Sequence, residues 1–514
     1  MKGLLSIGLF IFSLLLGLNP SSGQTGVMRL EFPAELEKNP YEVVPLDEEG
    51  LLMFYAQPEL IGETNRSWHF TFYDTNLYIK WEADIPVLDG ARYQAFHQED
   101  SSLYLLFYNP GKIKTGNENY QVSVLDLRSG IIDHFTGLLE GISEVRAFLV
   151  AHGKAIIACN MQNEQVGIYY LEVRRQSIKS HVIEFPDQNF LEDLQYDPNT
   201  GSVLVVVSNF LSRRQHRLVL MQFSISGDVM ATYPIEVVLP DKYLNSARVY
   251  PSGPANFVVI GTYSNFSSKI PGNNDYYGLE SAGFFMTRFE DGTQQFMNYY
   301  NIMELQNLRP SMSARDYLKL AKKKNRQEAE YSADYEMTLH PISQVGNQYV
   351  IMAEAFYPDF RTVSDISYDY WGRPITHTYT VFEGYRIFQS ILLGFDAEGT
   401  LLWDNSLELS NIKTLDLSYR SGYHFEGKPV VLFFNDGSKI SFNAFAENAV
   451  IEGVSYAELD TSYRGDKVVE LGNNFMDEWY DGYYLCYGYH TIRNHLLAEN
   501  EMRTVFYINK IIFE

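Results

Sequence analysis

The sequence predicts an all-β protein built from about eight repeated four-stranded units. A short apolar motif recurs at a spacing of about 50 residues, and two insertions of roughly 40 and 30 residues interrupt it. A unit of this size cannot bury its own apolar face, so its neighbours must complete the core. The copies of the motif are GLLMFYAQ from Gly50, SLYLLFYN from Ser102, GKAIIACN from Gly153, SVLVVVSN from Ser202, NFVVIGTY from Asn256, QYVIMAEA from Gln348, PVVLFFND from Pro429 and GYYLCYGY from Gly482.

Three further strands accompany each motif. An alternating stretch precedes it, as in ARYQAFHQ from Ala91, and a polar connection and another strand follow it. That following strand often ends in a turn with glycine, which supplies the positive φ of tight hairpins. We name the strands A to D, with the apolar motif as strand B. The clearest glycine turns end at Gly130, Gly227, Gly292 and Gly399.

This repeat resembles the blades of a β-propeller. The turn followed by tryptophan in DAEGTLLW, from Asp396, is similar to blades of quinoprotein-like propellers. The other repeats do not keep the tryptophan, so we expect no cofactor site and no cofactor. We expect eight blades, with seven as the alternative if the stretch from Pro429 onward is one blade split in two. The final TVFYINKIIFE reads as a strand C, and VMRLEFPAEL from Val27 is expected to add the missing outer strand and close the ring.

Residues 1–23 have the pattern of a secretory signal peptide. Lys2 is followed by an apolar run from Leu4 to Leu18 and by the small residues Ser21, Ser22 and Gly23. The run is short for a membrane span of about 20 residues. We therefore expect a single mature domain over 24–514, exported to the periplasm, the cell surface or the medium, with no membrane span.

Composition limits the partners and the redox chemistry. The formal net charge of −24 disfavours nucleic acid and anionic membrane surfaces. The two cysteines, Cys159 and Cys486, lie inside apolar motifs of the third and eighth repeats, which are not adjacent in a closed ring. We therefore expect both thiols to be buried and unpaired.

Both insertions are expected on one face of the ring. The first covers about 303–335, between strand D of the fifth unit and strand A of the sixth. The second covers about 356–386, between strands B and C of the sixth unit. The resemblance implies that such connections emerge on the face that usually carries ligands.

The first insertion is predicted to contain a short helix with basic residues. In SARDYLKLAKKKNRQEAE, from Ser313, a capping pattern precedes a short apolar stripe. This segment is either a solvated helix or a docking element for an acidic partner. The candidate docking residues are Lys322, Lys323, Lys324 and Arg326.

The second insertion is predicted to be a hairpin that turns at Trp371-Gly372-Arg373-Pro374. Its aromatic rings suit stacking on sugars or aromatic ligands, and its polar groups suit hydrogen bonds to hydroxyls or carboxylates. The alternative is that these rings only pack the hairpin on the ring. The candidate ligand-binding residues are Tyr368, Asp369, Tyr370, Trp371, Arg373 and His377.

The sequence favours binding over catalysis. It contains no HExxH or GxSxG motif, its histidines are too dispersed for a metal site, and we assign no catalytic residue. Our hypothesis is an exported propeller that binds a protein, peptide or glycan on its insertion-bearing face. Two alternatives stay open: a carbohydrate-active hydrolase or lyase that uses acidic residues such as Glu354, Asp359, Asp365 and Asp369, and a structural component of a cell-envelope assembly.

Overall fold

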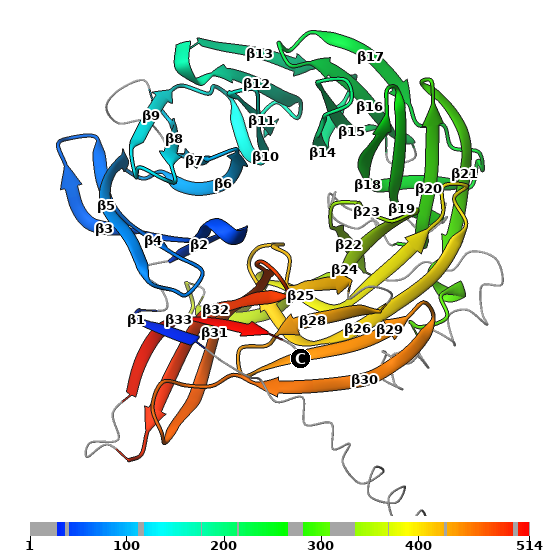
Figure 1. Cartoon of the computed structure of the whole chain (residues 1–514). Helices are drawn as coiled ribbons and strands as arrows, with labels where there is room; N and C mark the ends of the chain where they lie inside the picture. The colour runs from blue at the N-terminus through cyan, green and yellow to red at the C-terminus, as the bar shows by residue number, and fades with distance from the viewer. Residues whose placement is uncertain are drawn as a thin grey trace, which may run out of the picture.

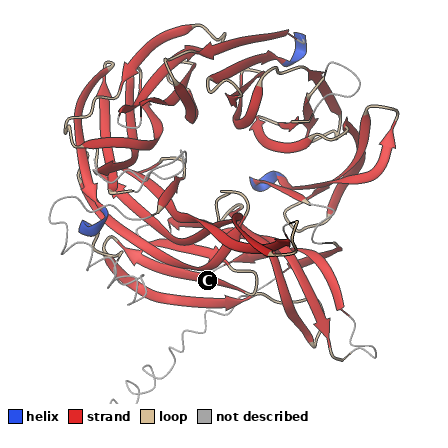
Figure 2. Cartoon of the chain, turned by 180° about the vertical axis from the view of Figure 1, so that it is seen from behind, coloured by secondary structure: helices blue, strands red, loops and turns tan. Residues whose placement is uncertain are grey.

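The computed structural model is a ring of eight antiparallel sheets, which is an eight-bladed β-propeller (Figure 1). Strands form most of the described chain, and the helices in it are three 3-10 turns, η1 (Asp47–Glu49), η2 (Val173–Arg175) and η3 (Ile302–Glu304) (Figure 2). The all-β prediction and the count of eight are both confirmed. The structure describes residues 28–35, 41–111, 118–175, 177–212, 215–265, 281–308, 335–368, 370–425, 429–496 and 502–512.

The first four blades contain four strands each, listed from the ring centre outward. They are β2 (Glu42–Leu46), β3 (Gly50–Ile61), β4 (Asn65–Tyr73) and β5 (Ile79–Leu88); β6 (Arg92–Glu99), β7 (Ser102–Tyr108), β8 (Tyr120–Asp126) and β9 (Ile132–Gly137); β10 (Ile142–Ala151), β11 (Lys154–Met161), β12 (Val166–Glu172) and β13 (Ser177–Ile183); and β14 (Gln188–Asp197), β15 (Ser202–Ser212), β16 (Gln215–Ser224) and β17 (Val229–Pro234).

The last four blades follow the same order with two variations. In the sixth blade, strand A is interrupted and its second piece, β23, pairs with β24; in the eighth, the outer strand comes from the other end of the chain. These blades are β18 (Lys242–Gly253), β19 (Asn256–Asn265), β20 (Gly283–Glu290) and β21 (Thr293–Asn301); β22 (Glu336–Leu339) with β23 (Ser343–Val345), β24 (Gln348–Tyr368), β25 (Pro374–Phe395) and β26 (Leu401–Thr414); β27 (Ser421–Phe425), β28 (Val430–Asn435), β29 (Lys439–Ala446) and β30 (Ala449–Glu458); and β31 (Asp466–Glu478), β32 (Tyr483–Asn494), β33 (Met502–Ile512) and β1 (Met28–Pro33).

The apolar motifs are strand B of every blade, because strand B is buried on both faces. In β15, Val203 and Val205 pack toward the third blade, whereas Leu204 and Val206 pack toward the fifth. A strand with a neighbour on each face needs an unbroken apolar run instead of an alternating one. The eight strands start within one residue of the predicted positions. The described residues accordingly form an apolar cluster between each pair of neighbouring blades, the eighth and first included.

Both cysteines are buried and unpaired, as predicted. Cys159 lies between the second and third blades and Cys486 between the seventh and eighth. Burial raises the pKa of Cys159 to about 12, so its thiol stays protonated at neutral pH.

The ring closes where the two ends of the chain pair. Strand β1 runs antiparallel to β33, from Met28 opposite Lys510 to Pro33 opposite Val505, which confirms the predicted closure. The apolar seam to the first blade contains Trp479, whose indole Nε1 donates to the Gly50 carbonyl at 2.9 Å. Strand pairing between the chain ends therefore completes the eighth blade, and apolar packing joins that blade to the first.

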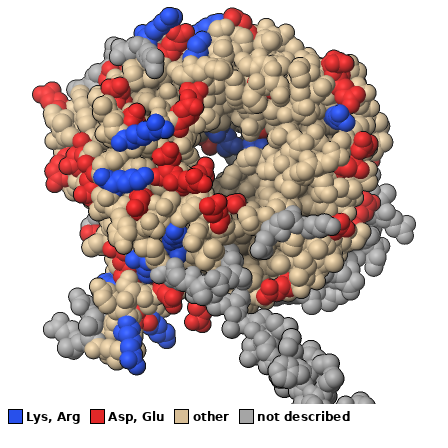
Figure 3. All heavy atoms as spheres, viewed as in Figure 1, with Lys and Arg blue, Asp and Glu red and all other residues tan. Residues whose placement is uncertain are grey.

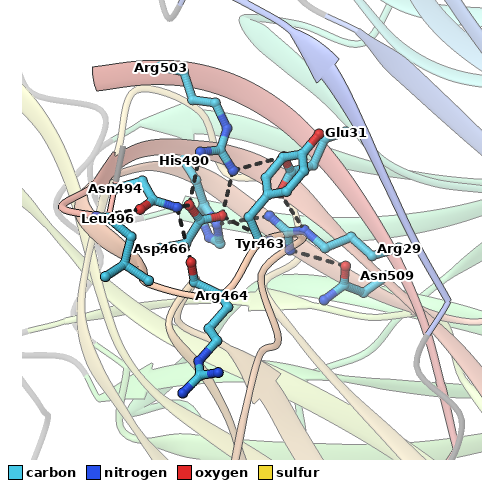
Figure 4. A network of polar contacts seen from close by, with 10 residues as sticks. All are labelled: Arg29, Glu31, Tyr463, Arg464, Asp466, His490, Asn494, Leu496, Arg503 and Asn509. Atoms are coloured by element: carbon cyan, nitrogen blue, oxygen red, sulfur yellow. Dashed lines mark hydrogen bonds and ion pairs between the residues drawn. The ribbon is translucent and has the colours of Figure 1, made fainter. Parts of the chain in front are cut away.

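A polar network adds to this closure (Figure 4). Arg503 of β33 donates to Asp466 of β31 at 3.0 Å and 2.5 Å and to Glu31 of β1 at 3.3 Å. Asp466 also accepts from the Asn494 amide at 2.8 Å, and its side chain is fully buried. The network therefore joins β1 to the innermost strand of the same blade.

The charges in this network depend on one another. Burial opposes ionisation of Glu31, yet the hydrogen bond and charge of Arg29 hold the pKa of that carboxyl below its usual value. Burial, together with the Arg29 charge, lowers the pKa of His490 to about 4. The neutral His490 ring donates from Nε2 to the Gly437 carbonyl at 2.6 Å, so it also joins this blade to the seventh.

Two predicted features lie outside the described residues. The predicted signal peptide, residues 1–23, and the predicted helix in the first insertion both fall on undescribed segments, so neither is confirmed. In the described part of the chain, no helix has the length and apolar character needed to cross a membrane.

We expect Arg503→Gln to lower the free energy of unfolding by about 2 kcal/mol, because it leaves the buried Asp466 carboxylate without its charged partner. Chemical denaturation followed by circular dichroism measures this change. Arg493→Gln, an exposed arginine on the neighbouring strand β32, is the control. Equal losses in the two variants would show that the network contributes nothing specific.

Candidate functional site

The described strand ends that bound the long connections lie at the same end of the blades, in agreement with the prediction that both insertions share one face. In antiparallel blades ordered A to D, the connection from B to C and the one from D to the next A leave from the same end. Three long connections share this end: the hairpin of β24 and β25, the segment between β19 and β20, and the segment between η3 and β22. We call this end the top face.

The second insertion is a long two-stranded ribbon, as predicted. Strands β24 and β25 pair continuously out to Tyr368 opposite Pro374. The inner strand β22 accompanies β24 only to Phe356, and β26 accompanies β25 only from Tyr385 inward. We call residues 360–382, which extend beyond both neighbours, the arm.

Ion pairs hold the base of the arm. Asp359 of β24 accepts from Arg386 Nε of β25 at 2.8 Å and lies 3.4 Å from Lys413 Nζ of β26. Lys413 also donates to Glu383 at 2.5 Å, and Glu383 pairs with Arg361 at 2.8 Å. The Arg386 hydrogen bond holds the pKa of Asp359 below its usual value. These contacts tie the three strands together where the ribbon leaves the sheet.

The arm exposes large apolar side chains on both of its faces. Directly opposite residues share a face, so Phe360 and Phe382 lie on one face and Val363 and Tyr379 on the other. The two phenylalanine rings are 5.6 Å apart between centroids. The large apolar side chains that are exposed by 37–95% are Phe360, Ile366, Tyr368, Tyr370, Trp371, Ile375, Tyr379, Val381 and Phe382.

The predicted ligand-binding residues lie at the outer end of the arm. Tyr370 is 95% exposed and Trp371 74% exposed, with their rings nearly perpendicular at 5.8 Å. The Arg373 guanidinium lies 5.5 Å from the centre of the Trp371 ring, a cation–π arrangement. His377 Nε2 lies 2.7 Å from the Ser367 hydroxyl across the strand pair. The structure therefore brings the aromatic and cationic candidates together in the turn.

The remaining candidates of the two insertions lie outside the described residues. Asp369 in the turn is one of them. The candidate docking residues Lys322, Lys323, Lys324 and Arg326 are the others.

The acidic candidates on β24 do not form a glycosidase pair. Along β24, Asp359 lies five residues from Glu354 and six residues from Asp365, which is about 16 Å and about 20 Å at the rise of a β-strand. Glycosidase carboxyls stand within about 10 Å of each other. Glu354 is also buried, and its Oε1 accepts from the Ser421 hydroxyl and amide at 2.7 Å each. His340 Nε2 lies 3.2 Å from the same oxygen, so this carboxylate links the sixth blade to the seventh.

A second polar feature surrounds the ring centre. The inner strands β6, β10 and β14 each carry a β-bulge, in which one extra residue has no partner on strand B. In all three blades this extra residue lies beside the fifth and sixth residues of strand B. In three other blades, the inner-strand residue opposite the fifth residue of strand B lies at the same height along the blade as these bulges. These residues are Glu42 beside β3, Arg248 beside β19 and His340 beside β24. Bulges are frequent beside functional sites because they redirect a side chain. We call this set the channel belt; it consists of Glu42, Gln94, Arg146, Glu192, Arg248 and His340.

Figure 3 shows that the ring centre is hollowed and that basic side chains lie inside the hollow. Arg248 of the belt donates to the Leu339 carbonyl at 2.9 Å and to the Glu192 carbonyl, and it pairs with Asp193 at 3.4 Å. It also donates to the Tyr419 hydroxyl at 3.3 Å. This one side chain therefore connects the inner strands of three blades and the loop before the seventh.

The opposite side of the channel carries two carboxyls with raised pKa values. Burial raises the pKa of Glu42 to about 8, and burial also raises the pKa of Asp477. Tyr487 donates its hydroxyl to Asp477 at 2.7 Å. The charges of both carboxyls act on Tyr93 and Tyr487, so the four side chains lie close together across the eighth, first and second blades. A carboxyl such as Glu42, whose pKa lies near neutral pH, is typical of sites that exchange protons.

Neither site offers a metal centre. Across the described ranges, no three histidine, cysteine, aspartate or glutamate side chains are grouped closely enough to hold an ion.

The comparisons with known proteins agree with the propeller architecture and go no further. No protein-family model and no curated protein matches the chain. Among solved structures, the chain is similar to the polysaccharide lyase Uly1, with 9% identity, a TM-score of 0.38 and coverage of 82% of this chain and 90% of that one. It is also similar to the β-propeller domain of the Trilobed protease from Pyrococcus furiosus, with 8% identity, a TM-score of 0.34 and coverage of 81% and 98%.

A third similar structure is the periplasmic gluconolactonase PpgL of Pseudomonas aeruginosa, with 9% identity, a TM-score of 0.33 and coverage of 82% and 99%. Overlaps this loose carry no functional argument. The fold assignment rests on the eight sheets of the chain itself.

We expect Glu42→Gln to stabilise the protein at high pH. The folded pKa lies above the ordinary value of 4.5, so ionisation of Glu42 destabilises the folded state increasingly as the pH rises from 4.5 to about 8. The variant should gain about 1 to 2 kcal/mol over the wild type at about pH 8 and nothing at about pH 4. Denaturant unfolding at several pH values measures this, with the exposed Glu48→Gln as the control. A pH-independent gain would contradict the raised pKa.

Proposed function

We propose that this protein is an exported binding protein that recognises a protein, peptide or glycan partner with its arm and has no catalytic step of its own. One observation carries the proposal: the arm exposes large apolar side chains on both faces and at its tip. An isolated two-stranded ribbon is marginally stable in water. Exposed aromatic groups on such a ribbon are the kind of surface that a partner covers.

The anchoring of the arm supports a recognition role. Ion pairs fix its base to β26, and the aromatic rings of Phe356 and Tyr385, 5.5 Å apart, extend the buried core of the sixth blade toward it. A rigid base holds the exposed tip in a defined position, which lowers the entropy cost of binding. The export pattern of residues 1–23 is consistent with an extracytoplasmic partner.

We expect Trp371→Ala to weaken partner binding by about 1 to 3 kcal/mol, because it removes a large stacking surface at the tip. The melting temperature should change by no more than a few degrees, since the side chain is 74% exposed. Binding of the purified protein to immobilised glycan and peptide arrays is the measurement. Tyr78→Ala, an aromatic residue 69% exposed on the first blade, is the matched control. Unchanged binding by the Trp371 variant would move the recognition surface elsewhere.

The second candidate function is a carbohydrate-active hydrolase or lyase in the channel. The raised pKa of Glu42, with Asp477 close to it, favours this function, because a general acid must be protonated at the working pH. Incubation with a panel of polysaccharides, followed by assays for new reducing ends and unsaturated products, tests this function. Activity that Glu42→Gln and Asp477→Asn abolish and Trp371→Ala spares would favour the enzyme over the binding protein.

A further inference from the structure

The outer edge of β25 is unpaired along the arm. Strand β26 pairs with β25 only from Tyr385 inward, and no described strand pairs with residues 374–384 on that side. The pairing with β26 ends at Tyr385; the next residue, Gly384, has a φ of 123°, and a Cβ atom there would lie 2.4 Å from the Thr414 carbonyl oxygen. Strand β26 therefore separates from β25 after Thr414, and the edge of β25 from Gly384 to Pro374 has no neighbouring strand among the described residues.

The two edges of the arm differ in composition. The outer edge of β24 carries Pro358, Asp359, Arg361 and Asp365, which are the residue types that protect an edge from pairing. Residues 375–382 of β25, ITHTYTVF, contain no Asp, Glu, Lys or Arg and are rich in β-branched and aromatic residues. A long uncharged edge of this kind accepts another strand.

We propose that the β25 edge pairs antiparallel with the β25 edge of a second copy of this chain. The open edge runs from Pro374 to Phe382, and its midpoint is Thr378. A two-fold axis through Thr378 is therefore the register that pairs the full edge in both copies. Opposite residues in this register lie on the same face: Thr376 meets Thr380, and Ile375 meets Val381, of the second copy.

The neutral charge of the arm permits a second copy to pair there, and the arm offers no net negative charge that would attract a strongly basic partner to it. The body carries the net charge of −24, but Arg361 and Arg373 balance Asp365 and Asp369 in the arm. The arm extends about 30 Å from its base, several times the screening length of about 8 Å at physiological salt. The acidic bodies are thereby kept apart while the neutral edges meet. Pairing turns each two-stranded ribbon into half of a four-stranded sheet, which is more stable than either ribbon alone.

Cysteine cross-linking tests the register. In Thr378→Cys the two new thiols face each other across the axis, at a distance between paired strands that a disulfide can span. The matched control is Ser364→Cys, at a residue that lies directly opposite Thr378 on β24 and is also exposed. Two copies of that residue are separated by three strand spacings, about 14 Å, which a disulfide cannot span. Since Cys159 and Cys486 are buried, the introduced thiols are the accessible ones.

We expect oxidised Thr378→Cys to run as a covalent dimer and Ser364→Cys as a monomer. Equal cross-linking of both variants, or of neither, would overturn the proposed pairing. The test does not depend on the proposed function, because Trp371 lies in the turn, outside the paired residues.

Charge substitution tests the same pairing without a cross-link. Two double variants place like charges opposite each other in the dimer: Thr376→Lys with Thr380→Lys, and Thr376→Glu with Thr380→Glu. Each variant alone should sediment as a monomer at concentrations at which the wild type dimerises. Mixing the two variants should restore the dimer. A wild type that stays monomeric at all concentrations, a dimer that survives in either variant alone, or a mixture that stays monomeric would contradict the proposal. Unchanged circular dichroism shows that each variant is folded.

Discussion

The burial of strand B on both faces is the constraint on which the rest of the molecule depends. A strand such as β15 leaves no face for solvent, so a blade needs a neighbour on each side. A row of such blades has two bare ends unless it closes on itself. The chain closes it by pairing β1 with β33 and by packing Trp479 against the first blade. Closure therefore follows from the same apolar burial that holds neighbouring blades together.

The arm departs from this rule. Along residues 349–356 the sixth blade's strand B is buried like the others, but the same strand continues into a ribbon whose side chains are exposed on both faces. The ion pairs of Asp359 and Lys413 lie where the buried part of the strand ends and the exposed ribbon begins. A two-stranded ribbon that exposes apolar side chains is marginally stable in water. We therefore interpret the arm as a surface that another molecule covers.

The channel belt shows how a regular ring acquires polar chemistry. Bulges at one height in three successive inner strands make Gln94, Arg146 and Glu192 extra residues without a partner in the register of strand B. Arg248 connects three blades there, whereas Glu42 and Asp477 lie among tyrosines that cannot neutralise them. Burial raises the pKa values of carboxyls on both sides of the channel, so the two sides differ in the partner that these carboxyls meet, which is Arg248 on one side and tyrosines on the other.

The sequence by itself determined the blades, because strand B is an uninterrupted apolar run in every repeat and its spacing shows through two insertions. It also determined the arm, since Trp371-Gly372-Arg373-Pro374 is a turn signal between two β-rich segments. It determined the pairing of the chain ends as well, since each end supplies part of one unit. Only the tertiary structure decided the polar sites. Arg146 in VRAFLVAH and Arg248 in SARVYPSG resemble ordinary solvent-facing positions of a strand, and nothing local indicates a bulge. Likewise, the pKa of Glu42 depends on which distant strands bury its carboxyl, and the open edge of β25 depends on where β26 stops pairing with it. The closed ring sets these contacts, and the residues next in sequence do not.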